Sequence, residues 1–383
     1  VLRGDYLTTG PTVAQFEQAL NQVTSARHAV SCSSGTAALH LGAMVLNLGP
    51  GDGVVVPAIT FLASANAARY VGAEVVFADV DSRTGLMGAE QLLEALRRAA
   101  AMGITVKAVV PVHLNGQCVN MAEVAALAHQ YGLAVVEDGC HALGAHYAVQ
   151  EQFYPVGCCQ HSDLVAFSFH PVKTVAMGEG GAVTTNRPDL YQRLLRLRNH
   201  GMTQQASEMQ QPELAFDTTA QSNPWYYEMA EPGYNYRASD IHCALGLSQL
   251  GKLARFVARR QQLVDRYDAL LAPLAPIVRP LARQPNCRPA WHLYVVQIDF
   301  ATLLAERGLD RAELMRRLRS RGIGTQVHYL PVAWQPYYRR RYGVIPLPGA
   351  QRYYEQVLSL PLFPTLTNDD VDRVVATLRE LVY

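Results

Sequence analysis

The chain has 383 residues, 49% of them hydrophobic, which favours two domains in one subunit. Its 33 Lys and Arg residues against 32 Asp and Glu residues give a formal net charge of +1, without the basic block typical of nucleic-acid binding. No apolar run is long enough to cross a membrane, and the seven scattered cysteines predict a reducing, cytoplasmic location without a metal site. The chain begins at Val1 without a methionine, so we expect further residues before it.

Strands and helices alternate steadily through the first half. Apolar periodicity predicts helices over residues 13–23, 62–70, 89–101 and 121–131. Short apolar runs predict strands over residues 29–32, 54–57, 74–80, 106–112, 133–137, 165–169 and 182–185. This order predicts an α/β fold, a mostly parallel sheet covered by helices, with ligands at the carboxyl ends of the strands.

The second half begins with a charged helix over residues 187–198, a surface excursion over 203–219 and a helix from Ile241. A long amphipathic helix over 255–271 is a plausible bridge to a second domain. Beyond several prolines we predict strands at 293–298 and 324–328 and helices at 311–321 and 369–381, the last with a capping box of Thr367 and Asp370. We therefore expect a large domain over residues 1–255 and a small α+β domain, with the bridging helix, over 256–383.

A turn rich in serine and glycine follows the first predicted strand. Ser33, Ser34, Gly35 and Thr36 open directly into an apolar helix, whose first backbone N–H groups have no partner within the helix. Such a turn can bind phosphate, although an ordinary N-cap explains it equally well on its own.

Asp138 directly follows the apolar strand at 133–137, which places its carboxylate at the edge of the sheet. A carboxylate there can hold a cationic ring nitrogen, but a strand-end aspartate is often only a helix cap.

Lys173 lies between the strand at 165–169 and a glycine-rich turn, in a loop that Pro171 keeps from becoming helical. We expect Phe167, Phe169, Pro171 and Val175 to wall it, which would lower its pKa and favour the neutral amine that attacks carbonyl groups. A lone lysine is usually a solvated surface charge. With Asp138 and the Ser33–Thr36 turn, however, it completes the amine, anion and phosphate cradle that an electron-sink cofactor needs.

The chain resembles the DegT/DnrJ/EryC1/StrS family of sugar aminotransferases, fold-type I enzymes that use pyridoxal 5′-phosphate (PLP). The resemblance rests on ordered blocks that cover nearly the whole chain: YLTTGP, SSGTAAL, PAITFLASANA, PVHLNGQ, VVEDGCHALGA, SFHPVKTVAMGEGGAVTTN, LRNHG, GYNYRASDIHCALGLSQL and VHYLPV.

The resemblance implies roles for individual residues. Lys173 would carry the cofactor as a Schiff base and act as the catalyst, and Asp138 would hold the pyridinium nitrogen. The other implied cofactor contacts are Gly35, Thr36 and Ser168 at the phosphate, Phe61 and His141 at the ring, and Asn235 from the neighbouring subunit of a homodimer. The implied substrate contacts are Thr9, Tyr236, Arg237, His328 and Tyr329.

Within the family, the SFHPVK block and the WYYEM and GYNYR segments most resemble the branch of pseudaminic acid biosynthesis. That branch implies L-glutamate as donor and, as acceptor, the UDP-linked keto-sugar UDP-2-acetamido-2,6-dideoxy-β-L-arabino-hexos-4-ulose. Two positions depart from the family pattern: Asn115 stands where tyrosine is common and Thr174 where proline is common. We expect neither to touch the cofactor chemistry, while Asn115 bears on the choice of sugar.

Three alternatives differ from this interpretation. One is another nucleotide-sugar 3- or 4-aminotransferase of the same family. A sugar dehydratase of the same fold would carry histidine in place of Lys173. A PLP-binding regulator would keep the cradle without reacting with glutamate. A Rossmann dehydrogenase has little support, because no G-x-G-x-x-G follows the first strand.

Overall fold

Seven strands form the main sheet in the computed structural model, which describes residues 1–383. In spatial order they are β1 (His28–Cys32), β9 (Gly181–Thr185), β8 (Leu164–Ser168), β5 (Ala134–Asp138), β4 (Thr105–Val109), β2 (Asp52–Pro57) and β3 (Glu74–Ala78). Only β9 runs against its neighbours; the pairs from β8 through β3 are parallel. The predicted α/β fold with a mostly parallel sheet is confirmed.

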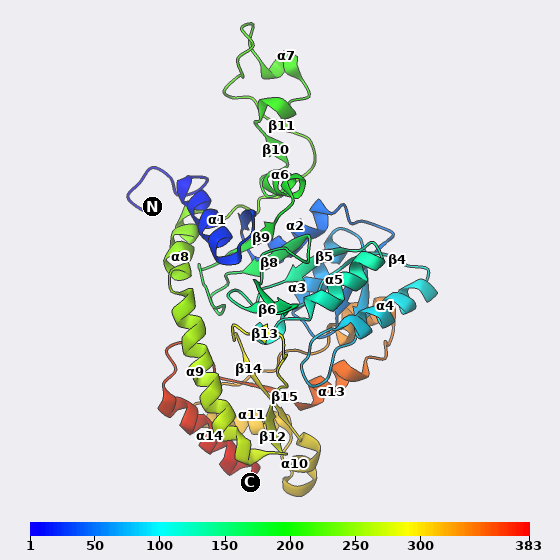
Figure 1. Ribbon diagram of the computed structural model, residues 1–383, viewed down its shortest axis with the longest axis vertical. Helices are drawn as coiled ribbons and strands as arrows, with labels where there is room; N and C mark the ends of the chain where they lie inside the picture. The colour runs from blue at the N-terminus through cyan, green and yellow to red at the C-terminus, as the bar shows by residue number, and fades with distance from the viewer.

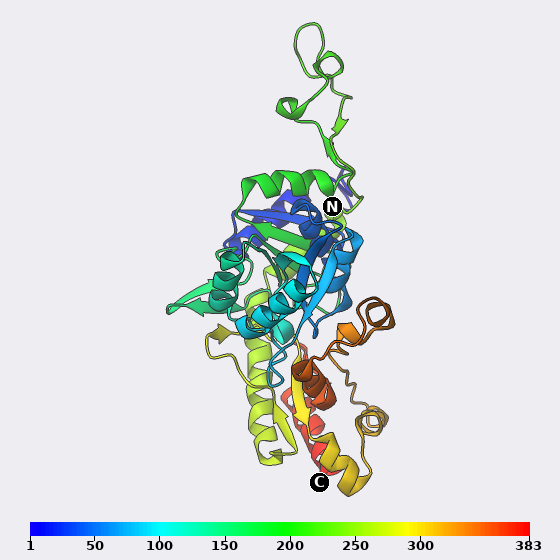
Figure 2. The same cartoon turned by 90° about the vertical axis from the view of Figure 1, so that its right-hand side faces the viewer.

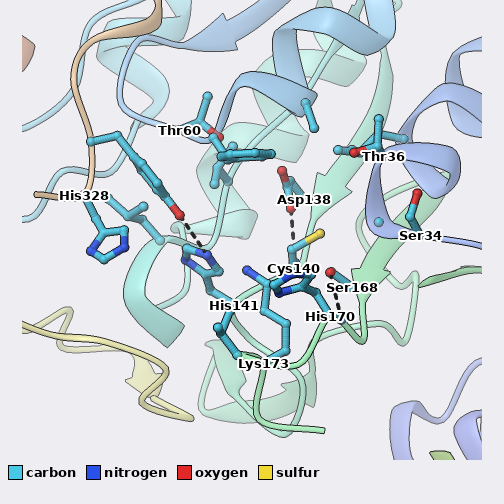
Figure 3. Close-up of a pocket in the computed structure, with 18 of the residues that line it drawn as sticks. Ser34, Thr36, Thr60, Asp138, Cys140, His141, Ser168, His170, Lys173 and His328 are labelled. Carbon is cyan, nitrogen blue, oxygen red and sulfur yellow. Dashed lines mark hydrogen bonds between the residues drawn. The ribbon is translucent and has the colours of Figure 1, made fainter. Parts of the chain in front are cut away.

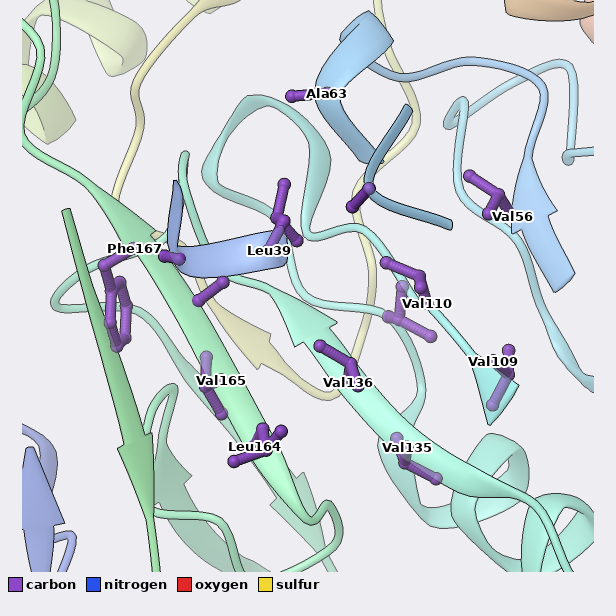
Figure 4. Packing of buried hydrophobic residues seen from close by; sticks show 14 of the residues in the cluster. Leu39, Val56, Ala63, Val109, Val110, Val135, Val136, Leu164, Val165 and Phe167 are labelled. Carbon is purple, nitrogen blue, oxygen red and sulfur yellow. The ribbon is translucent and has the colours of Figure 1, made fainter. Parts of the chain in front are cut away.

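The central strands are continuous apolar runs because both of their faces are covered. Val136 of β5 pairs with Leu164 of β8, and both are buried. Helix α2 (Gly35–Val45) crosses the sheet above them, with Gly42 close to both side chains. Figure 4 shows this packing, in which Leu39 of α2 lies near Val136 of β5 and near Val110, which directly follows β4. The core thus holds the carboxyl ends of β5 and β8 in fixed relative positions.

Further helices complete both layers. They are α1 (Pro11–Thr24), α3 (Leu62–Tyr70), α4 (Ala89–Ala101), α5 (Met121–Gln130), α6 (Pro188–Leu197) and α8 (Asp240–Leu250), with the short 3-10 turn η1 (Leu114–Gly116) before α5. None of the helices combines the length and apolarity needed to span a membrane.

A second hydrophobic core lies around a three-stranded antiparallel sheet in the order β12 (Val278–Pro280), β14 (Tyr294–Ile298), β15 (Val357–Leu360). Helices α9 (Leu253–Leu271), α10 (Phe300–Arg307), α11 (Arg311–Ser320) and α14 (Asn368–Val382) surround it, and α9 lies beside α14 (Figure 1). The capping box of Thr367 and Asp370 is confirmed. Helix α9 begins at Leu253, which belongs to the larger core, and ends at Leu271, which belongs to the smaller core. We therefore propose that the boundary between the two domains lies in this helix, between residues 255 and 256.

The predicted strand at 324–328 is wrong. Only Gln326 pairs there, as an isolated bridge to Ser359, because the chain turns away after one pair of hydrogen bonds. The sequence patterns also missed the small sheet of β13 (Cys287–Arg288), β6 (His146–Val149) and β7 (Gln152–Pro155). Likewise they missed α12 (Pro336–Tyr342) and α13 (Pro348–Gln356), which follow the 3-10 turn η4 (Val332–Trp334).

A long excursion, residues 202–229, projects away from the rest of the chain (Figures 1 and 2). We call it the arm. Its base is the two-residue ladder between β10 (Met202–Thr203) and β11 (Glu228–Met229), and it contains η2 (Ala206–Glu208) and α7 (Pro212–Ala215). The predicted surface excursion over 203–219 is confirmed and extends further along the chain. Trp225 at 74% exposure is its most exposed large apolar side chain.

Candidate active site

A cavity of about 340 Å³ opens at the carboxyl ends of β5 and β8 (Figure 3). Nine of the residues predicted for the site line it: Gly35, Thr36, Phe61, Asp138, His141, Ser168, Lys173, His328 and Tyr329. They come from chain segments that are far apart in sequence, and the sheet brings them together as expected for parallel strands.

Lys173 enters the cavity from the loop between β8 and β9. Its backbone N–H donates to the His170 carbonyl at 2.8 Å, and Met177 N–H donates to Phe169 O at 2.9 Å, which fixes the turn. Burial lowers the pKa of the Lys173 amine, although Cys140 and Asp138 oppose this shift. The predicted direction is confirmed.

The walls around Lys173 differ from the prediction. Phe167, Phe169 and Val175 point into the core, where Phe169 packs edge-on against Phe16 with ring centroids 5.3 Å apart. Pro171 is exposed. The lysine is instead enclosed by cavity residues from other segments, such as Cys140 and His328, so long-range packing causes its burial.

Asp138 is the last residue of β5 and its side chain is only 5% exposed. Oδ1 accepts from Cys140 N–H at 3.1 Å, and Oδ2 accepts from the Ser64 hydroxyl at 2.6 Å. Each carboxylate oxygen thus has one donor from the protein and further acceptor capacity toward the cavity.

The turn before α2 forms a cradle against Ser168. Ser34 caps the helix by accepting from Ala37 N–H at 3.1 Å, so Gly35 and Thr36 present amides without an intrahelical acceptor. A Cβ on Gly35 would lie 2.7 Å from Ser168 Cβ, which is too close for any other residue. The backbone and the Ser168 hydroxyl therefore meet around one small space at a helix N-terminus, the arrangement that binds phosphate.

His141 is held in one tautomer. Its Nδ1 accepts from the Asn115 backbone N–H at 3.4 Å, which leaves the ring proton on Nε2, 3.3 Å from the Tyr329 hydroxyl. Burial, and then the charge of Lys173, holds the pKa of His141 well below its usual range. The left-handed backbone of Asn115, with φ of 63°, directs that N–H at His141, so residue 115 meets the pocket through its main chain.

Two aromatic side chains and a histidine form the opposite wall. Phe61 remains 54% exposed at the cavity mouth, with its ring centroid 6.2 Å from that of Tyr329. His328 Nδ1 lies 2.8 Å from Ser359 Oγ on β15, and burial followed by the charge of Lys173 lowers its pKa to about 4. Phe61 has the free face that a stacked ring requires.

The residues present fit PLP. The amine of Lys173, the carboxylate of Asp138 and the Gly35–Ser168 cradle lie in one cavity, and the cradle is closed to any side chain at position 35. An aldehyde, a ring nitrogen and a phosphate each find a partner of suitable chemistry there.

Four predicted residues lie outside this cavity. Thr9 and Arg237 line a second cavity of about 290 Å³, where Arg237 Nη1 donates to Asn199 Oδ1 at 2.6 Å. The Tyr236 hydroxyl lies 3.1 Å from His40 Nδ1, and the Asn235 side chain is exposed. None of them reaches the Lys173 cavity of its own chain.

Sequence reasoning missed several residues of the site. Thr60, Ser64 and Cys140 surround Asp138, yet no pattern marked them as functional. Ser64 follows Phe61 by three positions at the start of a small-residue helix, which was the only available signal.

The model of the "DegT/DnrJ/EryC1/StrS aminotransferase family" matches residues 1–379. The chain belongs to this family. Its predicted membership is thus confirmed.

Relatives of this DegT/DnrJ/EryC1/StrS chain support the same conclusion. It is 36% identical, over 100% of its own length and 92% of the relative's, to the spore coat polysaccharide biosynthesis protein SpsC of Bacillus subtilis (strain 168). A Streptococcus pneumoniae protein solved in its PLP-form is similar at 28% identity and a TM-score of 0.84, over 100% of this chain and 93% of that one. Helicobacter pylori PseC, "involved in the biosynthesis of pseudoaminic acid", is similar at 27% identity and a TM-score of 0.85, over 100% and 94%. The chain is a PLP-dependent sugar aminotransferase.

Proposed function

We propose that this enzyme transfers the amino group of L-glutamate to the keto carbon of a nucleotide-linked sugar, with Lys173 as the catalytic residue. The observation that carries the assignment is the meeting of the Lys173 amine, the Asp138 carboxylate and the Gly35–Ser168 cradle in one cavity. The retained lysine also argues against a sugar dehydratase.

In this proposal PLP is held at three points. The amides of Gly35 and Thr36 and the Ser168 hydroxyl bind its phosphate, Asp138 faces its ring nitrogen, and Phe61 covers one face of the ring. When bound, PLP supplies an electron sink that makes the proton on the donor's α-carbon acidic. His141 Nε2–H points toward the side of the pocket where Tyr329 lies and donates to an oxygen there.

Lys173 moves the proton. Its amine is partly desolvated, which lowers its pKa and makes the neutral form that accepts a proton more accessible. With PLP bound, Nζ would take the proton from the α-carbon of glutamate in the first half of the reaction and would supply a proton to the sugar carbon in the second half. Water would supply the keto oxygen of 2-oxoglutarate as the amino group leaves glutamate, and that nitrogen would replace the keto oxygen of the sugar, which is released as water.

A homodimer would complete the site. The Tyr236 carbonyl accepts from Ser33 N–H at 2.8 Å, so segment 235–237 runs beside the phosphate turn while the Asn235 side chain faces outward. In the proposed dimer Asn235 reaches the phosphate of the second copy, and Thr9, Tyr236 and Arg237 contact sugar nucleotide across the interface. None of these four residues lines the Lys173 cavity of its own chain, which supports their contacting the site of the second copy.

For the acceptor we propose UDP-2-acetamido-2,6-dideoxy-β-L-arabino-hexos-4-ulose, aminated at its C4 position to give UDP-4-amino-4,6-dideoxy-N-acetyl-β-L-altrosamine. The SFHPVK block, whose His170 and Val172 line the mouth of the cavity, and the likeness to PseC support this choice.

Two measurements test the proposal. Adding L-glutamate to the PLP-loaded enzyme should shift its near-visible absorbance and release 2-oxoglutarate, whereas a regulator would show neither change. Incubation with UDP- and dTDP-linked 3-keto and 4-keto sugars, with products resolved by NMR, should give a 4-amino UDP-sugar as the main product. A preferred 3-keto or dTDP-linked substrate would overturn the acceptor assignment, and absence of the glutamate reaction would overturn the function.

A further inference from the structure

Ser64 connects the cavity to helix α3. It lies in the first turn of that helix, is 1% exposed, and places its Oγ 2.6 Å from Asp138 Oδ2. On its other side, Thr60 Oγ1 lies 2.7 Å from Ser64 Oγ. Thr60 is buried as well, so the two hydroxyls form a buried chain that ends on the carboxylate.

The direction of this chain follows from chemistry. An ionised carboxylate can only accept, so the proton of Ser64 points at Asp138. Ser64 has no second proton, and its contact with Thr60 must therefore use the proton of Thr60. The remaining oxygen of Asp138 accepts from Cys140 N–H at 3.1 Å. The carboxylate thus receives one protein donor on each oxygen, an arrangement that restricts its rotation.

We propose that Ser64, oriented by Thr60, is a positioning residue that holds the Asp138 carboxylate in the orientation that meets the cofactor's ring nitrogen. The inference rests on the proposed function, in which Asp138 pairs with that nitrogen. If the hydrogen bond from Ser64 to Asp138 only held α3 against β5, its loss would lower thermal stability. It would not change the relative affinity of the site for two ligands that differ only in having a nitrogen or a carbon in the ring.

The test compares two unreactive ligands of the cofactor-free enzyme: 4′-deoxypyridoxine 5′-phosphate, and its analogue with C–H in place of the ring nitrogen. Replacing Ser64 by alanine should weaken binding of the first by roughly tenfold, the effect of losing one hydrogen bond to a charged group. Binding of the carbon analogue should be nearly unchanged. Thr60→Val should give a smaller loss in the same direction.

Activity of the PLP-loaded enzyme gives a second readout. In Ser64→Ala, the half-reaction with saturating glutamate should slow by roughly tenfold while the KM for glutamate stays constant.

The matched control is Ser31→Ala. Ser31 is also buried and its hydroxyl donates to a carboxylate, Glu17 Oε1, at 2.7 Å, but away from the cavity. It should lower stability without changing the preference between the two ligands. Asp138→Asn separates the two proposals: if it keeps the preference and the activity, the assigned role of Asp138 fails. If Asp138→Asn loses both but Ser64→Ala matches wild type, only the inference on Ser64 is overturned.

Discussion

At the scale of single residues, Lys173 combines a defined loop position with an environment that favours its neutral amine. Lys173→Ala should abolish covalent attachment of PLP, seen as loss of the adduct after borohydride reduction and mass spectrometry. Turnover should fall by at least about 10²- to 10⁴-fold, the usual contribution of a general acid–base group.

The control for Lys173 is Lys107→Ala, since Lys107 is exposed on β4. It should retain both the adduct and the activity. An adduct that persists in Lys173→Ala, or transamination at the wild-type rate, would contradict the assignment of the covalent anchor.

The pH dependence of stability follows from His328. Burial, then the charge of Lys173, lowers its pKa from 6.5 to about 4, so the unfolded chain binds its proton at a higher pH than the folded chain does. Stability is therefore lost as pH falls from 6.5 to about 4, by on the order of 2 kcal/mol for this residue.

Urea unfolding of the cofactor-free protein between these pH values should show this loss, and His328→Gln should show a shallower slope. His129→Gln, an exposed replacement on α5, should behave like wild type. An unchanged slope in His328→Gln would mean that the histidine is solvated in the folded protein.

At the scale of elements, the first turn of α2 depends on the absence of a side chain at position 35. Gly35→Ala should weaken PLP binding by roughly tenfold or more, because the new Cβ would meet Ser168 Cβ at 2.7 Å and push the cradle apart. Absorbance titration of the cofactor-free protein measures this effect.

Gly42→Ala in the same helix is the matched control. Its Cβ would lie 3.5 Å from Val136 Cγ1, an ordinary contact, and alanine favours helix more than glycine does. Stability should be equal or slightly higher and the PLP affinity unchanged. If Gly35→Ala bound PLP as tightly as wild type, the phosphate would lie elsewhere.

The sequence predicted those parts of the site that local pattern determines. Asp138 and Lys173 each follow an apolar strand, and Gly35 follows a strand and opens a helix, so parallel-sheet geometry was enough to bring them together. His328 and Tyr329 came only from family resemblance.

Residues that act through tertiary packing could not be predicted in this way. Ser64 reaches Asp138 only because α3 docks beside the end of β5, and Asn115 acts through a backbone N–H in a left-handed conformation. The walls of Lys173 were wrong for the same reason: sequence neighbours such as Phe169 point into the core. The burial of Lys173 is decided by segments that are distant in sequence, and the apolar periodicity around Lys173 does not reveal which segments those are.

At the scale of the whole molecule, the proposed homodimer predicts complementation between two inactive variants. Lys173→Ala and Asn235→Ala each damage one half of a shared site. After mixing by mild denaturation and refolding, about half of the dimers carry one copy of each, and each of these has one intact site, so about a quarter of wild-type activity should return.

The same procedure applied to each variant alone is the control and should restore nothing. Mixed samples without activity, although exchange is verified by mass spectrometry, would show that Asn235 serves its own chain or has no role. Asn235→Ala with full activity before mixing would also exclude it from the site.

The arm joins the rest of the chain through the two adjacent strands of its base, β10 and β11. It bears acidic residues such as Glu208, Glu213 and Asp217, and it has no lysine or arginine between residues 203 and 229. Because its ends are close together, lengthening or shortening it changes the closure entropy only slightly and leaves the core strands in register. Natural variation can therefore remodel this segment while the catalytic groups stay fixed. Arms can thus be exchanged between relatives while the sheet is held constant.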